Sequence, residues 1–330
     1  MRKNLLFVVF FVLFAIALLS LGELRHTWRT LHNSDVRFMI LALLLLVCWI
    51  LNEAAGYRSL YKLMDIKVDF RHLVLLSSAG SFINVVAPSG GFGGVAVFVD
   101  DAGKRGMPRG LAAAVGALFL FLEYSAFMVV LVLGWVVYIR RSDLKPGEIT
   151  ASFIMLAIVV GLGILIYIGS QSGEKLGRIL GWFSHRINRL LWPILHREYF
   201  HEIAAHEFGV EVAAGLSILR KKRRGILIPF LFSLNSKLLQ TLILAMAFMA
   251  FDVPFTIGTI IAGFASAYLF LIVSPTPYGI GFVETLLPLA LTSLSVAWED
   301  SVIITLMYRG ITFWVPLFLG GISFRILQRE

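Results

Sequence analysis

Charged side chains within apolar runs are the residues of this sequence most able to do chemistry. Five lie inside or beside such runs: Glu53, Glu123, Lys237, Glu284 and Arg309. At the centre of a bilayer each charge costs roughly 2.5–3.5 kcal/mol on insertion scales, so such residues face a bundle interior or a wet cavity and usually pair. These five side chains therefore predict a polar site at membrane depth.

Two interpretations of these charges stay open. They could form structural ion pairs, for instance between Glu123 and Arg309. Alternatively, Arg309 and Lys237 receive the anionic group of a ligand, while the glutamates receive its amine or a proton. Arg309 is the stronger candidate for a phosphate, because a guanidinium binds phosphate oxygens bidentately.

Two stretches rich in glycine and proline interrupt the apolar runs: "APSGGFGGVAVF", residues 87–98, and "SPTPYGIGFVETLLP", residues 274–288. GFGGVA fits the dinucleotide fingerprint, but no strand–helix–strand unit surrounds it. A helix that restarts after either stretch exposes unpaired N–H groups, which bind phosphate or carboxylate. The alternative is that the glycines only permit close packing and a tight turn. The predicted ligand-binding residues here are Pro88, Gly90, Gly91, Gly93, Gly94, Pro275, Gly279 and Gly281.

The elements that must position these residues are membrane helices. The chain is 58% hydrophobic and 15% charged, whereas charged residues make up about a quarter of a soluble domain. A membrane span needs about 20 apolar residues, and the opening segment lacks the A-x-A site of a cleaved signal peptide. The sequence predicts an all-α polytopic membrane protein whose apolar segments are Leu5–Leu21, Phe38–Leu51, Leu111–Tyr138, Ile149–Gly169, Ile226–Phe251, Phe255–Val273 and Val302–Phe324.

The 29 Lys and Arg residues give a net charge of +9, and their distribution indicates a membrane rather than a nucleic acid. They cluster in Arg58–Arg71, Lys104–Arg109 and Lys175–Arg224, and at both ends of the chain. All these segments lie on one side if the N-terminus is cytoplasmic. The positive-inside rule thus predicts cytoplasmic N- and C-termini in a cell membrane.

The polar stretch 171–224 divides the chain into a first membrane repeat, 1–170, and a second, 225–330. Its apolar residues recur at helical spacing among arginines and two tryptophans, Trp182 and Trp192. This pattern indicates an amphipathic helix that lies either in the headgroup plane or on the protein's own cytoplasmic face. The nearby His196, His201 and His206 lack the H-E-x-x-H spacing. No metal or cofactor is predicted.

Two features recur at nearly the same spacing. Pro88 and Pro275 are 187 residues apart, and Glu123 and Arg309 are 186 apart. With the predicted topology, the first glycine stretch enters from the cytoplasmic side and the second from the outside. We therefore expect two inverted repeats, each with a broken or re-entrant hairpin, that meet near the midplane around a polar pocket, as in many transporters.

The sequence resembles the lysylphosphatidylglycerol synthase transmembrane family, also called flippase-like membrane proteins, over essentially its whole length. The resemblance rests on "APSGGFGG", "PTPYGIGFVE" and "YRGITFWVPLFLGG", and it adds Tyr308 to the predicted charge partners. Two departures stand out: Tyr124 follows Glu123 where an arginine is expected, and apolar "VAVF" follows Gly94. Since no aminoacyl-transferase domain follows Phe324, the resemblance implies transport of a lipid that a separate enzyme makes.

We therefore expect a flippase or scramblase that moves a phospholipid or polyprenyl-phosphate lipid between leaflets. Its expected partners are anionic or phosphate-bearing membrane lipids and a separate lipid-modifying enzyme. The sequence is compatible with an oligomer. One alternative is a membrane lipid or glycosyl transferase, with the adjacent acids Asp100 and Asp101 as acid and base. The other is a membrane scaffold that transports nothing.

Overall fold

The computed structural model describes residues 34–86, 92–140, 146–195 and 202–329, and within these ranges the protein is helical with no strand. The all-α prediction is confirmed. Five stretches are long and apolar enough to cross a membrane: α3 (Val36–Leu63), α6 (Arg109–Arg140), α7 (Pro146–Gln171), Arg224–Ala250 with α10 (Leu227–Ala250), and Trp298–Leu327 with α13 (Trp298–Arg309), η4 (Gly310–Trp314) and α14 (Val315–Leu327). The predicted span Leu5–Leu21 lies outside the described residues.

Two pairs of shorter helices lie between these spans. The first hairpin is α4 (Phe70–Val86) and α5 (Phe92–Lys104), and the second is α11 (Ile257–Val273), the short turn η3 (Pro277–Gly279) and α12 (Phe282–Ser293). A helix of 17 residues, such as α4 or α11, is about 25 Å long and falls short of a hydrocarbon core of about 30 Å. Each pair therefore has the dimensions of a re-entrant hairpin.

Several helix boundaries in the two halves share one shift, although α5 and α12, and the starts of α6 and α13, differ by 189 or 190 positions. α4 begins at Phe70 and α11 at Ile257, 187 positions later, while α6 ends at Arg140 and α14 at Leu327, again 187 later. The indole N–H of Trp49 in α3 donates to Ser236 in α10 at 2.9 Å, across the same separation of 187. The shared boundaries agree with the duplication that the two sequence features predict, which stays a prediction.

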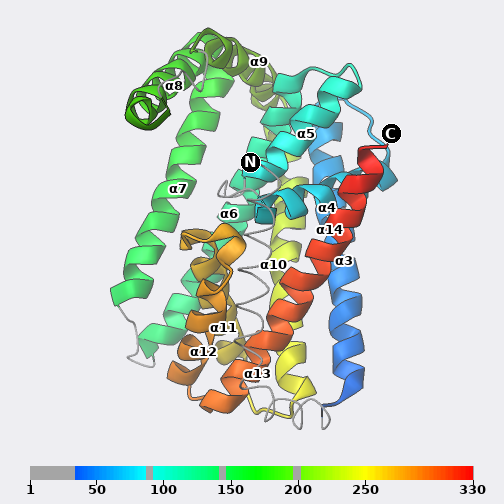
Figure 1. Cartoon of the computed structure of the whole chain (residues 1–330), viewed down its shortest axis with the longest axis vertical. Helices are drawn as coiled ribbons and strands as arrows, with labels where there is room; N and C mark the ends of the chain where they lie inside the picture. Colours follow the sequence, from blue (N-terminus) through cyan, green and yellow to red (C-terminus); the bar gives the residue numbers. More distant parts are fainter. Residues whose placement is uncertain (1–33, 87–91, 141–145, 196–201, 330) are drawn as a thin grey trace.

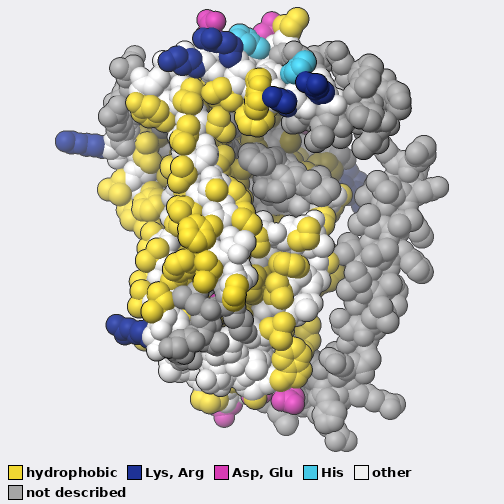
Figure 2. Space-filling view, turned by 90° about the vertical axis from the view of Figure 1, so that its left-hand side faces the viewer, with side chains coloured by type: hydrophobic (Ala, Val, Ile, Leu, Met, Phe, Trp, Pro, Cys, Tyr) yellow, Lys and Arg dark blue, Asp and Glu magenta, His cyan; other side chains and the backbone are white. Residues whose placement is uncertain are grey.

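Matching helices of the two halves run in opposite directions. In Figure 1, α3 ascends while α10 descends, and α6 descends while α13 and α14 ascend. α5 lies near the upper end and α12 near the lower end of the same view. Figure 2 shows a broad hydrophobic surface, with most of the visible Lys and Arg side chains gathered at the upper end.

The amphipathic stretch forms two helices, α8 (Gly173–Leu195) and α9 (Glu202–Lys221), at the upper end of the molecule (Figure 1). The buried residues of α8 are Leu176, Gly177, Ser184 and Asn188, among the side chains that the structure describes. Trp182 and Phe183 are exposed instead. The apolar side of α8 is thus partly packed on the protein, at Leu176 and Leu180, and partly exposed, at Trp182 and Phe183, so both predicted placements stay open.

Candidate functional site

A cavity of about 280 Å³ lies where the two hairpins meet. The first hairpin contributes Asn84 and Gly94 to its wall, and the second contributes Pro275, Thr276 and Tyr278. Acidic and basic groups from the spans complete the wall: Glu53 of α3, Glu123 of α6 and Arg309 of α13. Residues far apart in the sequence are thus brought around one polar space.

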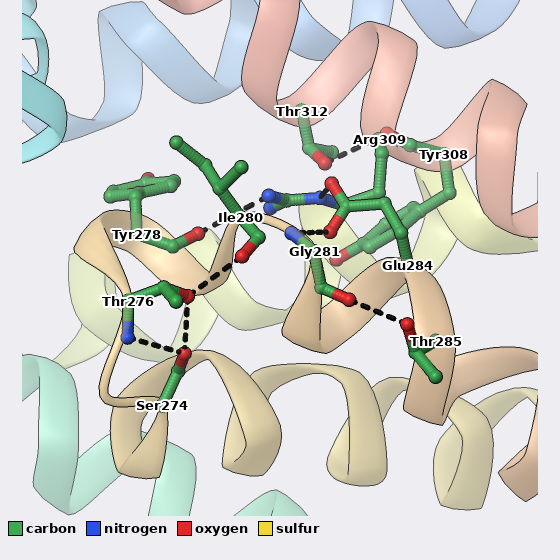
Figure 3. Close-up of polar contacts among 10 residues, drawn as sticks. All are labelled: Ser274, Thr276, Tyr278, Ile280, Gly281, Glu284, Thr285, Tyr308, Arg309 and Thr312. Atoms are coloured by element: carbon green, nitrogen blue, oxygen red, sulfur yellow. Dashed lines mark hydrogen bonds and ion pairs between the residues drawn. The ribbon is translucent and has the colours of Figure 1, made fainter. Parts of the chain in front are cut away.

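Arg309 is the one Lys or Arg among the described residues that borders this cavity, and three neighbours hold it in place. Its Nε donates to Glu284 Oε1 at 2.7 Å, and its Nη2 donates to the carbonyl oxygen of Tyr278 at 3.2 Å (Figure 3). The guanidinium carbon also lies 4.4 Å from the centre of the Phe313 ring. Directly after Arg309 the backbone widens into the π-helical turn η4, a feature that often marks functional sites.

The backbone beneath Arg309 is unusually bent. Tyr278, Gly279 and Gly281 all have positive φ angles, of 51°, 72° and 76°. Glycine adopts such angles without a steric penalty, whereas Tyr278 adopts one at a cost. This bend between α11 and α12 directs the carbonyl of Tyr278 toward Arg309, so the second glycine stretch positions the cation.

The second buried ion pair joins Lys237 and Glu123. Lys237 Nζ donates to Glu123 Oε2 at 2.6 Å and to the hydroxyl oxygen of Tyr268 at 2.7 Å. Glu123 and Tyr268 border the cavity, but Lys237 does not. The pairing of Glu123 with Arg309 suggested by their spacing is therefore wrong, and Lys237 is covered by its partners rather than presented to a ligand.

Glu53 is a further acid in the wall of the cavity. It borders the cavity from α3 and, within the part of the chain that the structure describes, forms no hydrogen bond or ion pair. A carboxyl group in such a place can receive a proton or an amine. Its position fits the predicted role of the glutamates better than that of Glu123, which already holds Lys237.

The N–H groups of Gly94 and Gly281 themselves already have partners. The N–H of Gly94 donates to Asn84 Oδ1 at 2.6 Å, and that of Gly281 donates to Glu284 Oε2 at 2.9 Å. The expected restart of a helix after Gly94 is wrong, because α5 already begins at Phe92 and Gly94 lies within its first turn. Gly94 also serves close packing, since a Cβ on the facing Gly80 would lie 3.2 Å from the Gly94 Cα.

The structure thus brings most of the predicted residues to one place. Those that border the cavity are Glu53, Gly94, Glu123, Pro275, Tyr308 and Arg309. Gly279, Gly281 and Glu284 stand directly behind Arg309 and Tyr278 without bordering it, and Gly93 is buried at the start of α5. Pro88, Gly90 and Gly91 lie outside the described residues.

Sequence analysis missed several polar residues of the wall. Ser77, Ser81 and Asn84 of α4 all border the cavity, and their spacing of four and three places them on one helix face. Gln240 of α10 and Thr276 also border it. The recurrence of Ser77, Ser81 and Asn84 within an apolar run is a signal that could have identified that face.

Asp100 and Asp101, the pair proposed for a transferase, lie elsewhere. Asp100 pairs with Lys104 near the surface, while His72 Nε2 donates to Asp101 Oδ2 at 2.9 Å and Arg105 Nη2 donates to His72 Nδ1 at 2.8 Å. Burial raises the pKa of Asp101, but hydrogen bonds and charges from His72 and Arg105 outweigh it and hold the pKa below its ordinary value. Neither acid borders the cavity. His72 of α4 with Asp101 and Arg105 of α5 forms a clamp between the two helices.

Comparison with known proteins decides the family. The family model "Lysylphosphatidylglycerol synthase TM region" matches residues 4–320. The chain belongs to this lysylphosphatidylglycerol synthase transmembrane family. That match spans both hairpins and the residues bordering the cavity, so the predicted resemblance is confirmed.

Similar members of the lysylphosphatidylglycerol synthase transmembrane family occur in archaea. The chain is 22% identical to the UPF0104 membrane protein MJ1595 of Methanocaldococcus jannaschii over 99% of its own length and 96% of that protein. It is 24% identical to the UPF0104 membrane protein PH1989 of Pyrococcus horikoshii, over 98% and 96%. The similarity therefore extends from end to end and covers both halves.

Proposed function

We propose that this protein moves a phosphate-bearing lipid between the two leaflets of a cell membrane. The headgroup passes through the cavity between the two hairpins while the acyl chains stay in the surrounding lipid. Arg309 binds the phosphate, and Glu53 receives a headgroup amine or a proton. The basic upper end of the molecule faces the cytoplasm, in keeping with the positive-inside rule.

The observation that carries this proposal is the shared cavity. Hairpins from opposite ends of the molecule both border it, and the buried Arg309 is in its wall. Its volume of about 280 Å³ is at the lower end of the roughly 300–1,000 Å³ typical of small-molecule sites. That space suits a headgroup and is too small for a whole lipid with its acyl chains.

The chemistry of the wall fits the barrier that a flippase must lower. An isolated charge in a low-dielectric interior costs tens of kcal/mol in the Born limit, unless protein groups replace its water. The wall offers a guanidinium, the hydroxyls of Ser77, Ser81 and Thr276, and the amide of Gln240. Such groups at membrane depth replace water around the headgroup midway across the bilayer. They thereby lower the free-energy barrier to its passage without any cofactor.

The test compares Arg309→Ala with the wild type in reconstituted vesicles. Fluorescent phosphatidylglycerol or phosphatidylethanolamine is placed in both leaflets, and dithionite added outside reports how fast inner lipid reaches the surface. Since a hydrogen bond to a charged group contributes about 1.5–3 kcal/mol, the variant is expected to be about ten- to a hundredfold slower.

The matched control is Arg325→Ala, the same change at an exposed position in the last turn of α14, and it is expected to keep the wild-type rate. Folding is checked by melting temperature, and Arg309→Gln with Glu284→Gln provides a variant in which no carboxylate is left unpaired. Translocation at the wild-type rate by folded Arg309→Ala overturns the proposal. A wild-type protein that moves neither lipid supports the scaffold alternative.

A further inference from the structure

The Glu284 carboxylate is held as a bound anion would be held. One of its oxygens accepts the hydrogen bond from Arg309 Nε at 2.7 Å, and the other accepts that from the N–H of Gly281, at the start of α12, at 2.9 Å (Figure 3). Guanidinium groups and helix N-termini are the donors that bind phosphate. A phosphodiester offers two free oxygens on one atom, as this carboxylate does.

The two partners differ in how firmly they are held. The Arg309 side chain is 3% exposed and the Glu284 side chain 27%. Arg309 also has the Tyr278 carbonyl and the Phe313 ring as neighbours. When the pair opens, the carboxylate is therefore the partner that moves, and the guanidinium stays in place.

The first turn of α12 also favours movement of Glu284. Pro288 lies four residues later within the helix, and proline has no N–H to donate to the carbonyl of Glu284. Gly281 adds a positive φ directly before the turn, and its Cα faces open space. The segment that carries the carboxylate is thus less constrained than an ordinary helical turn.

The cavity gives an incoming anion access to Arg309. Arg309 and Tyr278 border the cavity, whereas Glu284 does not. In the described part of the chain, the donors Nε and Nη2 of Arg309 have partners and Nη1 has none. An anion in the cavity can therefore contact the guanidinium through Nη1 before Glu284 leaves.

Exchange of one anion for another keeps the charge on this cation compensated. A buried guanidinium without a partner is strongly unfavourable, as is the desolvation of a lone anion. If Glu284 returns as the phosphate leaves, Arg309 is paired both before and after transport. The same return expels the phosphate, so that a tight complex does not stop turnover.

We propose that Glu284 is a resident anion that occupies the phosphate position on Arg309 and Gly281, and that a phosphodiester headgroup enters by exchanging with it. This inference rests on the proposed function, and it assigns Glu284 a competing role rather than a direct contact with the lipid. It predicts that removing the negative charge of Glu284 strengthens phosphate binding and slows release.

The experiment measures binding of dihexanoyl-phosphatidylglycerol to detergent-solubilised protein by calorimetry, with inorganic phosphate as a second probe. Glu284→Gln keeps an acceptor for Gly281 but removes the competing charge, and its Kd for the lipid is expected to fall about tenfold. Glu299→Gln, the same change at an exposed residue of α13, is the matched control with unchanged Kd. Glu284→Asp, too short to reach both donors, tests the inference with the charge retained and is expected to bind more tightly than the wild type.

The outcomes separate the two proposals. Equal or weaker lipid binding by Glu284→Gln and Glu284→Asp overturns the exchange while the proposed function stands. Undiminished lipid binding by Arg309→Ala overturns the proposed function itself. A gain for inorganic phosphate without a gain for the lipid shows a free-anion site and also overturns the exchange of a headgroup.

Discussion

Lys237 of α10 and Glu123 of α6 form a 2.6 Å ion pair in which both side chains are almost completely buried. The pair joins the two halves of the chain, and Tyr268 of α11 accepts a further hydrogen bond from the same ammonium. Removing one partner of a buried pair leaves an uncompensated charge and costs about 3–5 kcal/mol. The pair therefore fixes the wall of the cavity from behind.

Lys237→Met is accordingly expected to destabilise the protein by about 3–5 kcal/mol. Glu123→Gln in the same chain should recover a large part of this loss, because no charge is then left unpaired. Thermal unfolding in detergent measures both variants. Lys222→Met, which removes a more exposed pair with Asp65, is the control and should cost about 1 kcal/mol or less. If Lys222→Met and Lys237→Met lower the stability equally, the Lys237–Glu123 pair does not have the energetic role of a buried ion pair.

Gly279 and Gly281 are expected to differ in their tolerance of alanine. Both have positive φ, so either substitution strains the backbone by about 1–2 kcal/mol. A Cβ at Gly281 would meet nothing within 4 Å, whereas at Gly279 it would lie 2.6 Å from Val283 Cγ2 and 3.2 Å from the Leu271 Cα. Gly279→Ala should therefore lower the melting temperature more than Gly281→Ala. The reverse order would show that the turn is shaped differently.

The clamp between α4 and α5 is expected to weaken in acid. Because the pKa of Asp101 is lowered from its ordinary value of 3.8, its stabilisation is complete above that value and is lost as pH falls through the lower, folded-state pKa. At pH 7, Asp101→Asn should cost about 1.5–3 kcal/mol, the range for a hydrogen bond to a charged group. Melting temperatures of the wild type and Asp101→Asn are compared at pH 7, 5 and 3. The difference between the two proteins should shrink only at pH 3.

Asp100→Asn serves as the control for this clamp, because Asp100 is exposed and, among the residues that the structure describes, pairs only with Lys104 of its own helix. It should change the melting temperature little at any of the three pH values. A difference between wild type and Asp101→Asn that stays constant down to pH 3 would exclude the ion-paired carboxylate as its cause.

The sequence was most informative where one local property decides the structure. The apolar run 255–273 and the following Ser-Pro-Thr-Pro predicted a helix that stops before the prolines. In the structure α11 begins after its N-cap residue Thr256 and ends at Val273. Three of the five predicted charged residues, Glu53, Glu123 and Arg309, do border the cavity, since the cost of burying a charge leaves few other places. Membrane insertion imposes both outcomes on the local sequence.

The partners of those charges could not be predicted, because they depend on which helices become neighbours. Glu123 and Arg309 occupy nearly equivalent places in the two halves, but equivalence is not contact, and each pairs with another residue. The caps on Gly94 and Gly281 depend on side chains ten and three residues away. Helix packing brings Asn84 to Gly94, and no local pattern marks it.

The opposite entry of the two hairpins is tested by cysteine labelling in intact cells. Cys48, the single cysteine of the sequence, is first replaced by alanine, and Lys104→Cys and Glu299→Cys are then introduced separately. Both positions are exposed, Lys104 at the end of α5 and Glu299 at the start of α13, directly after the second hairpin. With the basic end in the cytoplasm, a membrane-impermeant maleimide should label Glu299→Cys only, and Lys104→Cys should react after the cells are opened.

Labelling of both variants in intact cells would place the two hairpins on the same side and contradict the inverted arrangement. Labelling of Lys104→Cys only would show that the protein has the reverse orientation in the membrane.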